Sequence, residues 1–550
     1  MKLTGLKEAP YRKIEKGLIM ASLLAFGSLL FLVPESIPLP ATETEGLSAI
    51  ASAMPNSGWA PLTVYFSAVG SISDSEEITK YEWDLDGNGV MDTDATRNNG
   101  YAQYNYQKPG EYTVTLQITD SSGNVARDSI PVSARHPGSS SVDYWSVFDD
   151  SRIRKVEIRL TQENWDLMWE DIEAKIEVPA DAVVFGETLE NIGFRMRGQF
   201  SMRESGWKKP WKINTDAYIA DQEYHNLRQL MFINSIGDPS MLAEKLSYDL
   251  MRFAGLPASH VTFVEFWIDI TDDQAPSQFW GVYTMIERVD RKFLSSRFTT
   301  DARDGNLYKA SHAQRGPMDL VYYGDNIDLY PHINGLVAYG KENNEEEGDY
   351  SDIIELCRII DGNEYDSPEA FAEALEGVFN VDSYLRYMAV IALTMNWDSY
   401  PYTGNNFYLF NNPVSGRFEW IPWDLTWGGD SRMPLFERGE FLISPYAPLF
   451  DNVFSVERYR RQYAAYLDLL MRYAFNYETI NTTAQAYHDM IDPYLHQQSG
   501  DKMYYGDTAW FTPYDFESAW QEMGVQADLR NRYVQSFLIQ EGYLKPDPED

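Results

Sequence analysis

Hydrophobic and polar residues alternate along short segments in the first quarter of the chain, and this two-residue period restricts the fold more than any other pattern. Residues 62–66 and 112–118 show the alternation clearly, and turn residues such as Pro109 and Gly110 separate the segments. Pro131 indicates an edge strand, because proline cannot donate a hydrogen bond to a neighbouring strand. The pattern predicts an antiparallel, immunoglobulin-like β-sandwich over residues 47–135.

An acidic loop interrupts this predicted sandwich at residues 84–92. Its oxygen-bearing side chains stand at alternate positions around a turn-forming glycine, an arrangement that suits a hard cation such as Ca²⁺. The glutamate usual at position twelve of such loops is replaced by Ala95, and Asp94 is a substitute. A polar turn without an ion is the alternative. The predicted calcium ligands are Asp84, Asp86, Asn88 and Asp92.

The N-terminal segment is typical of an exported protein. Basic residues precede an uncharged run of 17 residues at positions 17–33, closed by Pro34. This run is longer than the core of most signal peptides and matches the shortest membrane-spanning helices. The basic flank keeps the N-terminus in the cytoplasm and places the rest outside. We expect an extracytoplasmic protein that is anchored by this segment or secreted after its cleavage.

Composition gives the domain organisation and narrows the function. A polar stretch at residues 136–144, rich in Ser and Gly, predicts a linker between the sandwich and a large domain at 145–545, with residues 1–46 as stub, hydrophobic segment and spacer. The 83 acidic against 45 basic residues disfavour nucleic-acid binding. Cys357, the single cysteine, lies in an apolar helical pattern and is expected to be a buried structural thiol.

The large domain mixes strand and helix patterns. Residues 240–254 predict a helix that Gly255 ends, and helices dominate after Ser367. The domain is therefore expected to be α+β, with a sheet-rich first lobe and a helix-rich second lobe. The predicted strands are residues 155–160, 193–197, 261–270 and 280–286.

Two family resemblances follow from ordered sets of short stretches. Residues 60–64, 81–84 and 109–114 resemble a polycystic-kidney-disease (PKD) domain over residues 47–135. Such domains act as spacers or binding modules outside cells, which implies a cell-surface polymer as a partner. The second set resembles the spore-coat protein H (CotH) kinase family across most of 145–545. Its stretches are 195–201, 208–212, 242–246, 281–287, 305–309, 396–398, 405–408 and 421–424.

The CotH resemblance implies an atypical protein kinase that transfers phosphate from ATP to serine or threonine of secreted or surface proteins. Phosphoryl transfer needs a carboxylate for the acceptor, metal ligands and cations for the phosphates. Asp398 resembles the catalytic aspartate, while Asn406, eight positions later, and Asp424 resemble ligands for Mg²⁺ or Mn²⁺. The family often has another acid where Thr426 stands, which puts the number of metal ions in question. Buried ion pairs or capped loops are the alternative for both acids.

Four further residues are candidates for nucleotide binding. Lys209 and Lys212 are predicted to contact phosphates, and Glu244 to orient one of them from a helix. Glu287, at the end of a predicted strand, is assigned to the nucleotide-binding edge. The alternative for Lys209 is a solvated charge pair with Lys208. The alternative for Glu244 is a carboxylate near a helix start, where its charge is favourable without a ligand.

Two other functions remain open on the sequence. A noncatalytic surface adhesin or coat protein could use the same fold, but it would not need Asp398, Asn406 and Asp424 together. A glycoside hydrolase would use the many carboxylates and aromatic residues, yet a buried aromatic core explains the aromatic content equally well. No His-Glu-x-x-His, Gly-x-Ser-x-Gly or phosphate-loop motif occurs in the sequence.

Overall fold

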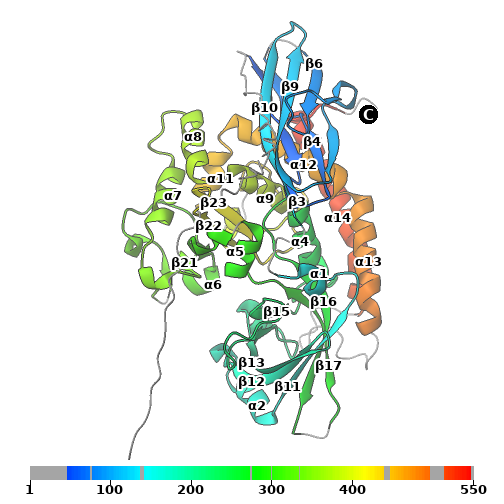
Figure 1. Cartoon of the computed structure of the whole chain (residues 1–550), viewed down its shortest axis with the longest axis vertical. Coiled ribbons are helices and arrows are strands. Elements are labelled where there is room, and N and C mark those ends of the chain that lie inside the picture. Colours follow the sequence, from blue (N-terminus) through cyan, green and yellow to red (C-terminus); the bar gives the residue numbers. More distant parts are fainter. Residues whose placement is uncertain are drawn as a thin grey trace, which may run out of the picture. The chain divides into compact units, whose positions relative to one another are not determined.

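A computed structural model describes residues 46–74, 77–136, 142–272, 275–298, 300–333, 335–438, 446–495 and 513–546 (Figure 1). These residues all belong to one compact unit, Pro38–Asp550. Among them, no helix combines the length and hydrophobicity needed to cross a membrane. The predicted anchor at 17–33 and most of the predicted linker lie outside the described residues.

The N-terminal part is a β-sandwich, as the alternating pattern predicted. One sheet has the strand order β3-β10-β9-β6-β7 and the other the order β2-β4-β8, with β1 and β5 paired separately. Val64, Trp83 and Leu116 are fully buried between the sheets. The strands are β1 (Leu47–Ser48), β2 (Ser52–Met54), β3 (Ser57–Trp59), β4 (Leu62–Ser67), β5 (Ile72–Ser73), β6 (Ile78–Asp84), β7 (Thr93–Asp94), β8 (Ala102–Tyr106), β9 (Gly110–Asp120) and β10 (Val125–Arg135).

The expectation of an edge strand at Pro131 was wrong in one respect. Strand β10 pairs with β9 on one side and with β3 on the other. However, the parallel pairing with β3 begins only at Ser133, so Pro131 precedes the stretch that would need its missing N–H. The proline is therefore tolerated inside the sheet.

The first part of the large domain is a closed barrel with the strand order β11-β12-β13-β14-β15-β17-β16. The predicted strands and the helix before Gly255 are confirmed; Gly255 has φ of +80°, the left-handed conformation that ends a helix. Closure of the barrel was not foreseen. Its strands are β11 (Arg154–Leu160), β12 (Val178–Val184), β13 (Glu187–Met196), β14 (Trp211–Asn214), β15 (Gln229–Ile233), β16 (Val261–Ile270) and β17 (Gln278–Ile286), and its helices are α1 (Tyr144–Val147), α2 (Gln162–Glu170), α3 (Phe200–Glu204), α4 (Ala243–Phe253) and α5 (Arg291–Arg297).

The second part is helix-rich, as predicted, and surrounds a small sheet of order β21-β18-β22-β23 (Figure 1). Cys357 is buried beside Tyr339, which confirms a structural thiol. The helices are α6 (His312–Arg315), α7 (Ser351–Asp361), α8 (Pro368–Val378), α9 (Val381–Thr394), α10 (Tyr400–Thr403), α11 (Pro448–Val453), α12 (Glu457–Tyr473), α13 (Tyr477–Leu495) and α14 (Pro513–Gln540). The strands are β18 (Leu307–Lys309), β19 (His332–Ile333), β20 (Leu336–Val337), β21 (Gly340–Lys341), β22 (Phe407–Asn412) and β23 (Arg417–Pro422).

The sandwich packs against helices of the large domain. Tyr101 donates a hydrogen bond of 2.7 Å to Asp468 on α12, and the ring of Tyr65 stacks on Tyr473 at 4.0 Å. Asn56 accepts a hydrogen bond from Arg386 on α9. These aromatic and polar contacts hold the sandwich against α9 and α12.

Candidate functional site

The β22–β23 hairpin brings two of the predicted metal ligands to one end. Phe407 lies opposite Pro422 in the antiparallel register, so Asn406 directly precedes one strand and Asp424 closely follows the other. Both residues have a left-handed backbone, with φ of 64° and 50°. Asn and Asp tolerate this conformation better than most residues, and such strain often accompanies functional sites.

Asp398 lies in the loop after α9 and is tied to this hairpin. The amide of Asn406 donates to the carbonyl and to the Oδ2 atom of Asp398, each at 2.9 Å. Asn396 accepts hydrogen bonds from the Asp398 N–H at 3.1 Å and from the Thr426 hydroxyl at 2.8 Å. Thr426, at the position where the family often has an acid, thus joins the two loops.

Glu244, from the first turn of α4, completes an acidic cluster with Asp398, Asn406 and Asp424. One helical turn later, Tyr248 accepts a hydrogen bond of 3.1 Å from the Asp424 N–H. Burial, together with the charge of Asp424, raises the pKa of Glu244 well above its usual range, although Arg197 opposes the shift. The Glu244 Oε1 atom is buried and has no hydrogen-bond partner among the described residues.

Asp424 has a similar electrostatic environment. Its side chain reaches solvent, yet the loss of hydration from surrounding protein raises its pKa, and Asp398 adds to that rise. Arg197 and Lys309 act against this rise and lower the pKa of Asp424. Glu244 and Asp424 thus each have a pKa raised by burial and by a neighbouring carboxylate, which is typical of a site that takes up a proton or a cation.

Arg197 and Lys309 lie beside these acids, and Lys212 lies close enough to Arg197 for that guanidinium to lower its pKa; the three are called the basic cluster. Burial, with Arg195 next in effect, lowers the pKa of Lys212 to about 7. Burial also lowers the pKa of Lys309, whose ammonium lies 5.3 Å from the ring centres of both Tyr408 and Trp423. Within the described part of the chain, none of the three side chains forms a hydrogen bond or a salt bridge. Desolvated cations in this state favour an anionic ligand.

Sequence reasoning missed two members of this basic cluster. Arg197 and Lys309 stand inside stretches that carry the family resemblance, but neither was chosen as a site residue. The register offers a signal for Arg197: Arg195 lies opposite Lys212, and Arg197 is two positions on from Arg195. Residues two apart on a strand share a face, so a cationic face could have been foreseen. We find no comparable signal for Lys309.

The structure gives Lys209 and Glu287 structural partners. The Lys209 ammonium donates to the carbonyls of Met202, at 2.7 Å, and Ser205, which closes the loop after α3. Glu287 is 1% exposed, accepts from the Tyr144 hydroxyl, and forms a 2.6 Å salt bridge with Arg297. These contacts favour structural roles, and the assignments of Lys209 to phosphate and of Glu287 to the nucleotide edge stay predictions that no described contact supports.

The family model for CotH kinase protein matches residues 194–533, more than half of the 550-residue chain. The chain belongs to the CotH kinase family. A PKD domain model matches residues 50–133, so the sandwich that precedes the CotH domain is a PKD domain.

Curated relatives share this family at low identity. Inner spore coat protein H of Bacillus subtilis (strain 168) is 24% identical over 52% of this chain and 74% of that protein. Invasin CotH3 of Rhizopus delemar is 22% identical over 56% of this chain, which spans only 50% of the invasin. The solved PKD1 domain of Vibrio cholerae metalloprotease PrtV is 22% identical, covers 16% of this chain and 98% of that one, and has a TM-score of 0.14.

The acidic loop of the PKD domain brings Asp84, Asp86 and Asp92 together, with one oxygen of each within 4.8 Å of the others. The side-chain oxygen of Asn88, in the same loop, accepts a hydrogen bond of 2.8 Å from the Val90 N–H. The Asp84 carboxylate also accepts three backbone N–H groups of the loop, at 2.8–3.1 Å. Three of the four predicted ligands are therefore adjacent, and calcium binding stays a prediction.

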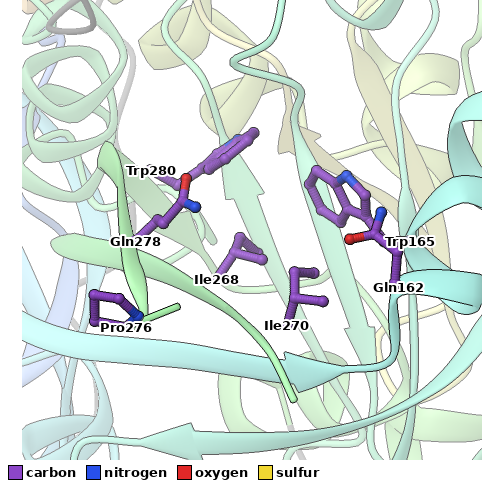
Figure 2. Close-up of a pocket in the computed structure, with 7 residues that line it drawn as sticks. All are labelled: Gln162, Trp165, Ile268, Ile270, Pro276, Gln278 and Trp280. Atoms are coloured by element: carbon purple, nitrogen blue, oxygen red, sulfur yellow. The ribbon is translucent and has the colours of Figure 1, made fainter. Parts of the chain in front are cut away.

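A pocket of about 160 Å³ opens on the CotH barrel near the ends of β16 and β17 (Figure 2). In Figure 2 the indole rings of Trp165 and Trp280 lie above the aliphatic side chains of Ile268 and Ile270. Its lining contains none of the residues of the acidic or basic clusters, so the pocket is separate from those two clusters. The lining residues are Gln162, Trp165, Ile268, Ile270, Pro276, Gln278 and Trp280.

Replacing Glu244 by glutamine should stabilise the protein at alkaline pH. A carboxyl whose pKa is raised by folding lowers stability progressively as the pH rises above about 4.3, its usual value in the unfolded chain. At pH 8, Glu244→Gln should therefore melt at a higher temperature than wild type, by an amount equivalent to about 1–3 kcal/mol for an unsatisfied buried group. At pH 4 the variant and wild type should melt at the same temperature. Thermal melting followed by circular dichroism measures both.

The matched control is Glu373→Gln, which removes one exposed carboxylate on α8. It accounts for the general effect of lowering the net charge of −38. If the two variants gain equally at pH 8, the Glu244 charge is not destabilised by its site.

Proposed function

We propose that the CotH domain is a metal-dependent protein kinase that transfers phosphate from ATP to serine or threonine residues of secreted or surface proteins. Membership of the CotH kinase family supports a kinase and implies ATP. The observation that carries the proposal is the juxtaposition of the acidic and basic clusters, in which Asp424 interacts electrostatically with both Arg197 and Asp398.

The basic cluster suits the ATP phosphates. Arg197, Lys212 and Lys309 are close enough to influence one another, since Arg197 lowers the pKa of both lysines. A polyphosphate would relieve this repulsion and supply the acceptors that these donors lack. Lys212 thus keeps its predicted role, whereas Lys309 takes the place given to Lys209.

The acidic cluster fits a divalent cation. Its candidate metal ligands are all oxygen atoms, which a hard cation prefers. The Glu244 Oε1 atom is buried and has no hydrogen-bond partner among the described residues, and a bound cation would supply one. Asp424, Asn406 and Glu244 would hold Mg²⁺ or Mn²⁺. Because Asn406 uses its amide nitrogen on Asp398, its oxygen is the atom left for a metal. The ion, when bound, would neutralise charge on the transferring phosphate.

Asp398 is proposed to orient the acceptor hydroxyl and to receive its proton. The two hydrogen bonds from Asn406 hold its backbone and one carboxylate oxygen in place. A positioned carboxylate of this kind contributes about 10²–10⁴-fold to a transfer rate. Glu244, which was predicted to orient a lysine, is assigned instead to the metal side because Asp424 is its main charged neighbour.

A noncatalytic adhesin is the second candidate. Three relatives carry the name invasin, and this chain spans about half of each. The strained, desolvated acids and the cations without partners speak for catalysis, because a binding surface gains nothing from the destabilisation they cause.

Replacement of Asp398 and Asp424 by asparagine should separate their roles. Asp398→Asn should lower phosphate transfer by about 10²–10⁴-fold and leave binding of an ATP analogue largely intact. Asp424→Asn should weaken metal-dependent nucleotide binding as well, since a metal ligand acts before and during transfer. Autophosphorylation and analogue titration with and without Mg²⁺ measure these effects. Wild-type activity in both variants would remove the kinase assignment, and a wild type that binds no nucleotide would favour the adhesin.

Loss of the Lys309 ammonium should weaken ATP binding. Lys309→Met keeps the aliphatic packing on Tyr408 and Trp423 but removes a charged donor worth about 1.5–3 kcal/mol, so the dissociation constant should rise about 10- to 100-fold. Lys108→Met, at an exposed position in the PKD domain, is the control. Equal affinities in the two variants would exclude Lys309 from the phosphate site.

Calcium should stabilise the PKD domain through Asp84, Asp86 and Asp92. An ion that binds only the folded state raises the melting temperature, and at 100 times its dissociation constant it adds about 2.7 kcal/mol. Melting of wild type and of Asp86→Asn with and without millimolar Ca²⁺ tests this. A wild-type melting curve that calcium does not change rejects the site.

We also propose that the PKD and CotH domains lie outside the cytoplasmic membrane, held or delivered by residues 17–33. The motivation is the basic flank before this uncharged run. A topology reporter fused after Pro34 should be active only on the outer side of the membrane, and cytoplasmic activity would contradict the assignment. A secreted or surface protein is then the phosphate acceptor, and a cell-surface polymer is the proposed ligand of the PKD domain.

A further inference from the structure

Three potential metal ligands meet between helices α13 and α14, outside the proposed phosphate site. His488 and Asp492 stand four positions apart on α13, so they share one helix face. Glu517 projects from α14 opposite them. One ligand atom from each residue lies within 4.8 Å of the other two.

The histidine is held as a ligand would be. His488 is 6% exposed; its ring stacks on Phe516 at a centroid distance of 4.7 Å and contacts the tilted ring of Trp520 at 5.4 Å. Its Nδ1 atom lies 3.4 Å from a carboxylate oxygen of Asp489. In metal sites, a carboxylate on one ring nitrogen commonly fixes the tautomer that leaves the other nitrogen free to bind metal.

The Nε2 atom of His488 faces the acids without a hydrogen bond. It is buried and has no such partner among the described residues, although it lies 3.5 Å from the Glu517 Oε2 atom. In a tetrahedral zinc site, bonds of about 2.0–2.2 Å separate neighbouring ligand atoms by about 3.4 Å. The observed separation is that of two ligands sharing an ion.

We propose that His488, Asp492 and Glu517 bind a divalent transition metal of the Zn²⁺ type. One imidazole and two carboxylates suit zinc and its neighbours, whereas Ca²⁺ and Mg²⁺ prefer oxygen ligands alone. The ion joins α13 to α14 and leaves a coordination position for water or another ligand. Tyr487, adjacent to His488, donates at 2.7 Å to Asp249 of α4, so the site anchors a helix that contacts the element carrying Glu244.

Cobalt binding to the purified full chain tests this site. After treatment with a chelator, titration with Co²⁺ should give the visible absorption of a tetrahedral site, and one equivalent of Zn²⁺ should abolish it. Glu517→Gln should weaken Co²⁺ binding more than 10-fold, because even the loss of an outer-sphere partner costs about 10–100-fold. Glu517 is exposed, so this variant should fold normally.

The control is Glu522→Gln, which alters another exposed glutamate of the same helix and should bind Co²⁺ like wild type. Equal binding by Glu517→Gln and wild type would overturn the proposal by locating the metal elsewhere. Absence of a tetrahedral Co²⁺ spectrum in wild type would also overturn it, leaving His488 and Glu517 as a simple ion pair.

Discussion

The aromatic core around Trp420 is the interaction on which the candidate site depends. Trp420 is fully buried on β23, stacks on Phe407 of β22 at 4.3 Å, and contacts Tyr384 of α9 at 5.0 Å. These contacts hold the hairpin against the helix. Because Asn406 and Asp424 flank the hairpin and Asp398 follows α9, the same packing fixes all three, and polar loops alone could not place them so closely.

Packing at this point sets opposite charges against each other in a partly desolvated site. The chain carries a net charge of −38, yet Arg197 and Lys309 lie beside Asp424, and Lys212 lies near Arg197. Burial disfavours the charged forms of Lys212, Lys309, Asp424 and Glu244. Phosphates with a divalent cation would compensate both signs together, which neither a polysaccharide nor a nucleic acid alone would do.

Much of the fold followed from periodicity. Alternation predicted the sandwich, strands were also predicted where β11 and β16 lie, and an apolar helix face ended by Gly255 predicted α4. Closure of the barrel and the position of Pro131 inside a sheet could not be foreseen, because strand pairing joins residues far apart in sequence. The CotH and PKD relationships were recognisable from ordered short stretches, and both family matches confirm them.

The sequence by itself identified Asp398, Asn406 and Asp424 as candidate site residues, because they stand in stretches that resemble the CotH family. Tertiary structure alone decided which charges accompany them. Lys209 donates to nearby carbonyls and Glu287 pairs with Arg297, whereas Arg197 and Lys309 form no side-chain hydrogen bond or salt bridge with the described residues. Residue type specifies a charge, but only the packed chain decides whether that charge is neutralised by the protein or left for a ligand.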